Sequence, residues 1–112
     1  MNGASLPKAG MRELDIYLPS VRNDGDAVDP DIIEQIKVSL MNAFGGYTHL
    51  KNSCEGAWKM GGVTFRDEVT IIVSLDDVST GFDILTFRRN LETVLDQEKI
   101  LIVAREVTVL DD

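Results

Sequence analysis

The sequence predicts an α+β fold in which one four-stranded antiparallel sheet carries two helices on one face. Two segments repeat apolar residues at helical spacing, and segments that alternate apolar and polar residues precede and follow each of them. A Gly-Gly pair between the two middle alternating segments predicts a hairpin turn. The resulting order is β-α-β-β-α-β. Two right-handed crossovers that share one sheet in this order give the ferredoxin-like sandwich.

Length and composition fit one small soluble domain. Of the 112 residues, 44% are apolar and 27% are charged, which is enough apolar material for a core. Residues 1–10 contain two Gly and one Pro without an apolar period, so we expect a flexible N-terminal arm followed by a single domain over residues 11–112. The chain has no run of 18 apolar residues and no signal-peptide core, which predicts a cytoplasmic protein without a membrane partner.

The charge and the rare residue types exclude several function classes. The net charge of −8, with scattered basic residues, argues against nucleic acid as a partner, since nucleic-acid binders present a basic stripe. A single cysteine, Cys54, excludes an internal disulfide framework, and a single histidine, His49, excludes a multi-His metal site. No phosphate loop, dinucleotide fingerprint or zinc motif is present. We therefore expect no metal and no cofactor.

The first strand and the first helix have clear boundaries. Alternation from Arg12 places Leu14, Ile16 and Leu18 on one side of a strand that Pro19 ends. Asp29-Pro30 predicts a helix start, because the carboxylate accepts from unpaired N–H groups and proline needs no donor at the first helical position. Gly45-Gly46 predicts the helix end.

The later elements follow the same logic. The second helix should be capped by Ser79 or Thr80, and its apolar stripe begins at Ile84. The expected strands are residues 47–60, interrupted near Asn52-Ser53, then 63–75 and 100–110.

Each predicted helix has a single apolar stripe, so the two helices should cover only one face of the sheet. The other face is then open, or is covered by a partner. We expect this open face to mediate a homo-oligomer, a dimer or higher. Its predicted members are Tyr17, Arg66, Glu68, Thr70, Ile72, Ile100, Ile102 and Glu106.

The Gly61-Gly62 turn fixes a register that gathers charged residues. Met60 should face Val63, Trp58 should face Phe65, Ala57 should face Arg66, and Glu55 should face Glu68. Trp58 and Phe65 should pair on one face, and Glu55, Arg66 and Glu68 should lie together on the opposite face. One interpretation is a carboxylate pair with an arginine that moves protons or holds a small polar ligand, with Trp58 as a ligand-stacking residue. The other is a surface salt-bridge cluster, with Trp58 as an anchor in a packed interface or core.

The stretch from Gly45 to His49 is a second candidate site. Tyr47 could line a small-molecule pocket together with Tyr17, and His49 could act as its acid or base. The alternative is a plain helix end and strand start, with His49 at a sheet edge and no acidic partner at a fixed spacing.

Three short motifs carry a resemblance: Phe44-Gly45-Gly46-Tyr47-Thr48, Glu55-Gly56-Ala57-Trp58 and Arg66-Asp67-Glu68. The pattern resembles small uncharacterised ferredoxin-like proteins of bacteria, phages and mobile gene cassettes. Those proteins share the helix-end motif, a Gly-x-Trp strand and an acidic strand after a short turn. The resemblance implies the ferredoxin-like fold and no established activity, so it assigns no catalytic residue.

Three functions remain open. The first is a self-associating binding or regulatory module that uses the open sheet face. The second is a small-molecule-binding protein or an enzyme, with an acid/base pocket at that face built from Glu55, Arg66 and Glu68. The third is an acidic mimic of nucleic acid, which the net charge permits although the acidic residues do not form a strip.

Overall fold

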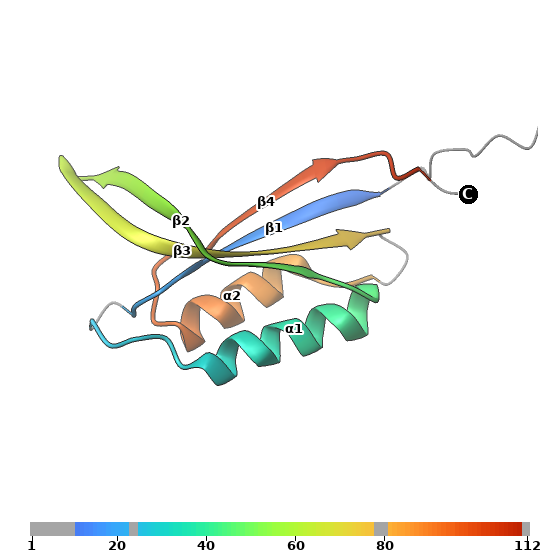
Figure 1. The fold of residues 1–112 in the computed structure, drawn as a ribbon, viewed down its shortest axis with the longest axis horizontal. Coiled ribbons are helices and arrows are strands. Elements are labelled where there is room, and N and C mark those ends of the chain that lie inside the picture. The colour runs from blue at the N-terminus through green and yellow to red at the C-terminus, as the bar shows by residue number, and fades with distance from the viewer. Residues whose placement is uncertain (1–10, 23–24, 78–80, 111–112) are drawn as a thin grey trace, which may run out of the picture.

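The computed structural model describes residues 11–22, 25–77 and 81–110, and the expected arm at residues 1–10 lies outside them. One four-stranded sheet has the order β2-β3-β1-β4, and all neighbouring strands are antiparallel. Both helices lie on one face of the sheet (Figure 1). The predicted ferredoxin-like fold is confirmed. The elements are β1 (Arg12–Pro19), α1 (Pro30–Phe44), β2 (Thr48–Met60), β3 (Val63–Asp76), α2 (Ile84–Val94) and β4 (Leu101–Glu106).

The ends of α1 lie where the sequence predicts them. Asp29 accepts a hydrogen bond from the backbone N–H of Asp31, and Pro30 opens the first turn. At the other end Gly45 adopts a left-handed conformation with φ of 81° and donates its N–H to the carbonyl of Met41. Glycine reaches this conformation without a Cβ clash, so the helix stops here and β2 can start at Thr48.

Two predicted boundaries are wrong. Asp83 caps α2, in place of Ser79 or Thr80, and accepts from the backbone N–H and the hydroxyl of Thr86. It lies directly before Ile84, the first residue of the apolar stripe, so the cap and the stripe begin together. β4 ends at Glu106 because its neighbour β1 begins at the residue opposite, Arg12.

The core lies between the sheet and the two helices. Leu14, Ile16 and Leu18 of β1 have no exposed surface. Residues that lie on the same side of the sheet as these three side chains therefore face the helices. The core cluster consists of Ile16, Leu18, Ile36, Leu40, Ile72, Leu91, Leu95 and Ile100.

The expected membership of the open face is largely wrong. Ile72 lies opposite Ile16, and both Ile72 and Ile100 are buried under the helices; the strand alternation puts Thr70, Ile102, Glu68 and Glu106 on that side as well. Tyr17 lies on the open face as predicted, opposite Ile71 and Leu101. The cause is the register between β1 and β3, which puts the less apolar side chains of β3 on the same face as the apolar side chains of β1. The apolar row of β3 therefore faces away from the helices: Val69, Ile71, Val73 and Leu75.

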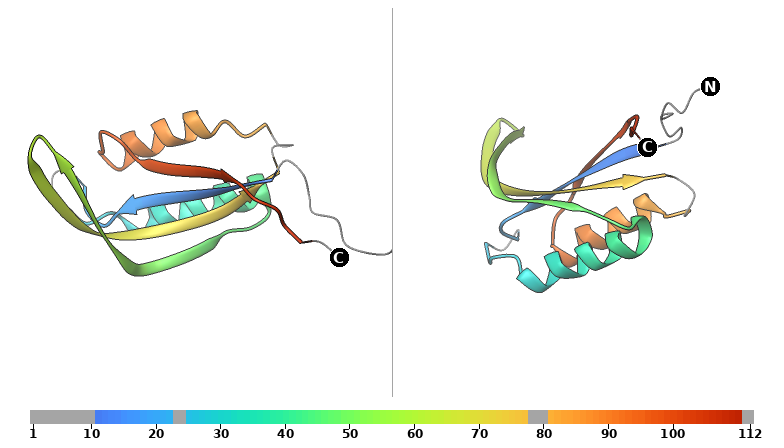
Figure 2. Two further views of the ribbon diagram at one scale, coloured as in Figure 1. Left: turned by 90° about the horizontal axis from the view of Figure 1, so that it is seen from above. Right: turned by 45° about the vertical axis from the view of Figure 1, so that its right-hand side comes forward.

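β2 and β3 continue beyond the helices as a two-stranded arm, residues 54–69. The predicted register is confirmed, with Trp58 opposite Phe65 and Glu55 opposite Glu68. A register shift lies between Leu50 and Cys54, where the sequence predicts an interruption. The arm curls toward the side of the sheet opposite the helices (Figures 1 and 2).

Within the described residues, no helix is long and apolar enough to cross a membrane.

Candidate functional site

The uncovered face of the sheet is mostly apolar. Strand pairing places Tyr17, Ile71 and Leu101 side by side across three strands of this face. Leu101, Leu75 and Leu50 are among the exposed large apolar side chains of the described residues. A contiguous exposed apolar surface on a small domain is typical of an interaction site.

A charged cluster lies within this apolar face. Glu13 and Asp15 are two residues apart on β1 and so share one side of the strand, and Arg105 of β4 lies opposite Glu13. The Arg105 guanidinium donates to Oδ2 of Asp15 and lies with its Nε 3.4 Å from Oε2 of Glu13. Two carboxyl groups share one cation, so the ionic centre carries a net charge of −1 when all three residues are ionised.

Asp15 is the most unusual member of this ionic centre. Only 6% of its surface is exposed, although no helix covers this face. Its Oδ1 is buried and has no hydrogen-bond partner. An unsatisfied buried acceptor is costly and rare, so the atom requires a donor, which either a protonated Glu13 or a group from outside the chain can supply.

Glu13 is set up to hold a proton. A hydrogen bond between the two carboxyl groups, followed by burial, raises the pKa of Glu13, and the Arg105 guanidinium only partly offsets this. Asp15 in turn raises the pKa of Arg105, which keeps the guanidinium charged. The arrangement can accept a proton on Glu13 or a hydrogen-bond donor from outside the chain.

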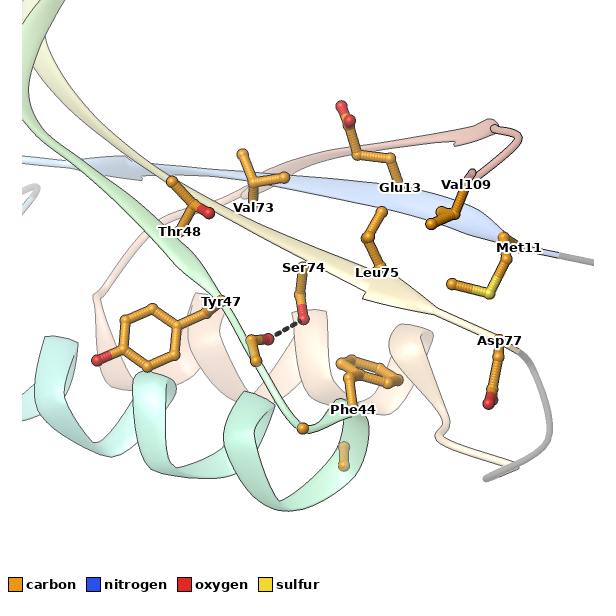
Figure 3. Close-up of a pocket in the computed structure, with 13 residues that line it drawn as sticks. Met11, Glu13, Phe44, Tyr47, Thr48, Val73, Ser74, Leu75, Asp77 and Val109 are labelled. Carbon is orange, nitrogen blue, oxygen red and sulfur yellow. Dashed lines mark hydrogen bonds between the residues drawn. The ribbon is translucent and has the colours of Figure 1, made fainter. Parts of the chain in front are cut away.

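A groove of about 570 Å³ adjoins the ionic centre and shares Glu13 with it. It lies at the end of the sheet where β1 begins and β3 ends, beside the last turn of α1 (Figure 3). The Ser74 hydroxyl donates to the carbonyl of Gly46 at 2.6 Å and fixes the chain after α1 against β3. The lining residues are Met11, Glu13, Ala43, Phe44, Gly45, Gly46, Tyr47, Thr48, Val73, Ser74, Leu75, Asp77 and Val109.

The predicted site residues fall in different places. Tyr47 lines the groove, but its ring is directed along α1 and away from Phe44 (Figure 3), with the Lys37 ammonium 5.9 Å from the ring centre. His49 lies opposite Ile72 on the helix side and does not line the groove. Its Nδ1 is buried without a partner, and burial together with nearby lysines lowers the pKa of the imidazole.

The arm residues do not join the ionic centre. Glu68 follows the same alternation along β3 as Ile72, so the Glu55–Glu68 pair lies on the opposite side of the sheet from the open face. The predicted location of the pocket is therefore wrong, although the pair itself forms. The backbones of Trp58 and Arg66 have the expected register, and their side chains lie outside the described part of the structure.

The charged residues of the open face, Glu13, Asp15 and Arg105, do not appear among the sequence-predicted site residues. The signal for Glu13 and Asp15 is their two-residue spacing on the polar side of a predicted strand. Arg105 is 90 residues further along the chain and joins them only through strand pairing. No group of three or more His, Cys, Asp or Glu side chains suited to a metal ion occurs among the described residues.

Several solved structures share the fold, among them the following two. The divalent cation tolerance protein Cut A1 from Thermus thermophilus aligns over 87% of this chain and 84% of its own, with a TM-score of 0.62 and 9% sequence identity. A phage SAM lyase in complex with S-methyl-5'-thioadenosine aligns over 92% and 86%, with a TM-score of 0.59 and 12% identity. Identities this low establish the fold alone. Neither a protein-family model nor a curated protein sequence matches the chain.

Proposed function

We propose that this protein is a self-associating binding module whose copies contact one another through the open sheet face. The observation that carries the proposal is the outward apolar row of β3, which the chain's own helices leave uncovered. Val69, Ile71 and Val73 are half-buried and Leu75 is 40% exposed, so covering each of them contributes part of the roughly 1.5–3 kcal/mol that full burial of an exposed apolar side chain gives. A second copy would also exclude water from the ionic centre and could supply a donor to Asp15.

The arm supports self-association independently. A two-stranded hairpin without a covering layer is at best marginally stable in water. Ala57, Lys59 and Thr64, which lie on the same side of the arm as the Glu55–Glu68 pair, are exposed. Because the arm curls toward the open-face side, it is positioned to lie against a second copy (Figure 2).

A leucine pair tests this proposal. Leu101 on the open face is 58% exposed and Leu85 on α2 is 52% exposed, so the two side chains offer similar apolar area on different surfaces. Leu101→Glu should lower the mass measured by light scattering toward that of one chain and weaken association at least about tenfold. Leu85→Glu should leave the mass unchanged. A single-chain mass for the wild type at micromolar concentration, or equal effects of both variants, contradicts self-association.

A second candidate function is small-molecule binding. The groove beside the ionic centre favours it, and a protein of the same fold holds S-methyl-5'-thioadenosine. That compound is therefore the first probe, and binding should raise the melting temperature in proportion to occupancy. No shift at millimolar concentration argues against an adenosine thioether.

In this second function, the arm residues would form a ligand site separate from the groove. If Glu55, Glu68 and Arg66 hold a polar ligand where the arm meets another copy, Arg66→Ala should abolish ligand protection without unfolding the chain. Unchanged protection in this variant removes the arm from the binding site and leaves the groove.

A further inference from the structure

We propose that the groove binds an organic cation, a primary ammonium group on an apolar body, with Glu13 as its carboxylate anchor. The inference rests on the small-molecule function proposed above and names the chemical class of the ligand.

The lining of the groove has a strong bias in charge. Two of its residues, Glu13 and Asp77, carry carboxylates, and among the lining residues of the described chain none is Lys, Arg or His. The whole chain adds a net charge of −8. With Glu13 and Asp15 sharing the single positive charge of Arg105, the groove beside Glu13 favours a cation over a carboxylate or phosphate ligand.

The apolar part of the groove accounts for the body of the ligand. Leu75, Met11 and Val109 lie together at the end of the sheet (Figure 3), and Leu75 lies opposite Glu13 in the strand pairing. Phe44 borders the groove from the helix side of β3. Phe44 is held in place by an edge contact with Phe82, with ring centres 5.0 Å apart. A preformed apolar wall with a few polar groups at its rim is the usual composition of a small-molecule site.

The ionic centre explains why Glu13 is the anchor. The Arg105 guanidinium is already engaged by Asp15, and its Nε lies 3.4 Å from Glu13. Glu13 and Asp15 share the single positive charge of Arg105. An ammonium group bound to Glu13 would supply a second positive charge, next to an ionic centre that is partly shielded from water.

The test uses three probes of matched shape: 2-phenylethylamine, 2-phenylethanol and phenylacetate. Binding is followed by chemical-shift changes of backbone amides at Gly45, Gly46 and Leu75. The amine should bind at least tenfold more tightly than the alcohol, and phenylacetate should bind least. Glu13→Gln should remove most of the preference for the amine and leave the affinity for the alcohol unchanged.

Glu98→Gln is the control, because Glu98 is exposed and lies outside the groove. This variant should bind the amine as the wild type does. Equal affinities for amine and alcohol, an unchanged preference in Glu13→Gln, or an equal loss in Glu98→Gln overturns the inference. Light scattering on the same ligand-free samples reports self-association separately, and the S-methyl-5'-thioadenosine titration reports the broader small-molecule function.

Discussion

Two buried aspartates of the sheet should respond in opposite ways to replacement by valine. Asp76 is 1% exposed, and its Oδ2 lies 2.8 Å from both Nε and Nη2 of Arg12. Asp15 is 6% exposed, and one of its oxygens has no hydrogen-bond partner. Its partner Arg105 keeps 53% of its side chain exposed, so that guanidinium remains solvated when the carboxylate is removed.

The magnitudes follow from these contacts. Asp15→Val loses one charge-assisted hydrogen bond of roughly 1.5–3 kcal/mol and removes an unsatisfied acceptor that costs roughly 1–3 kcal/mol. It also buries about 1.5 kcal/mol of apolar surface, so the net change should be a stabilisation of about 1 kcal/mol. Asp76→Val loses two charge-assisted contacts and leaves Arg12 partly buried, which should cost about 3 kcal/mol.

Urea unfolding followed by circular dichroism measures both free energies. The two variants should differ by about 4 kcal/mol, which for a chain of this length corresponds to melting temperatures more than about 10 °C apart. Equal protein concentrations are required, because the proposed self-association would add to the measured stability. If both variants lose the same stability, Asp15 is a satisfied structural ion pair and the interpretation of its Oδ1 is refuted.

Three smaller perturbations test other regions. Burial and nearby lysines lower the pKa of His49, so the unfolded chain binds a proton on this imidazole more readily than the folded chain does. The free energy of unfolding should therefore decrease as the pH falls below 6.5. NMR titration of this single histidine should give a pKa below 6.5. The pKa of Glu13 is raised, so the native state binds the proton more readily. The contribution of this proton to the free energy of unfolding is fully present below pH 4.5 and is lost as the pH rises through the raised pKa. In urea unfolding at a series of pH values, Glu13→Gln should no longer show this loss of stability. An unchanged pH profile in the variant contradicts this assignment. Gly45→Ala should cost about 1 kcal/mol because φ is 81°, whereas Gly46→Ala, which has open space around its Cα and no positive φ, should cost much less; equal losses on thermal unfolding would argue against strain as the cause.

The element order and the hairpin register could be predicted because both depend on local signals. The period of apolar residues separates helix from strand, and Gly61-Gly62 fixes how β2 meets β3. The helix cap at Asp29 is equally local. The cap of α2 was missed because Ser79, Thr80 and Asp83 are all good capping residues, and only the position of the first packed turn selects among them.

Which face of β3 the helices cover could not be predicted from the sequence. The alternation of apolar and polar residues shows that the two faces of the strand differ, but it does not show which face the helices cover. The row Val69, Ile71, Val73 and Leu75 is the more apolar one, so it is the natural candidate for the core. In the structure β1 supplies Ile16 and Leu18 under the helices, β3 supplies Ile72, and Ile100 lies directly before β4. The site residues were missed for a related reason, since Arg105 meets Asp15 only when β4 pairs with β1, which lies far away in the sequence.

This failure of the local prediction has a physical meaning. A chain that places its most regular apolar row away from its own helices exposes that row to water, unless another surface covers it. Apolar contact alone would allow two such faces to meet in several registers. The charges of Glu13, Asp15 and Arg105 restrict the choice, because an arrangement that leaves them against apolar atoms costs several kcal/mol. In the proposed assembly the apolar row would supply the affinity, and the ionic centre would determine where the second copy can bind.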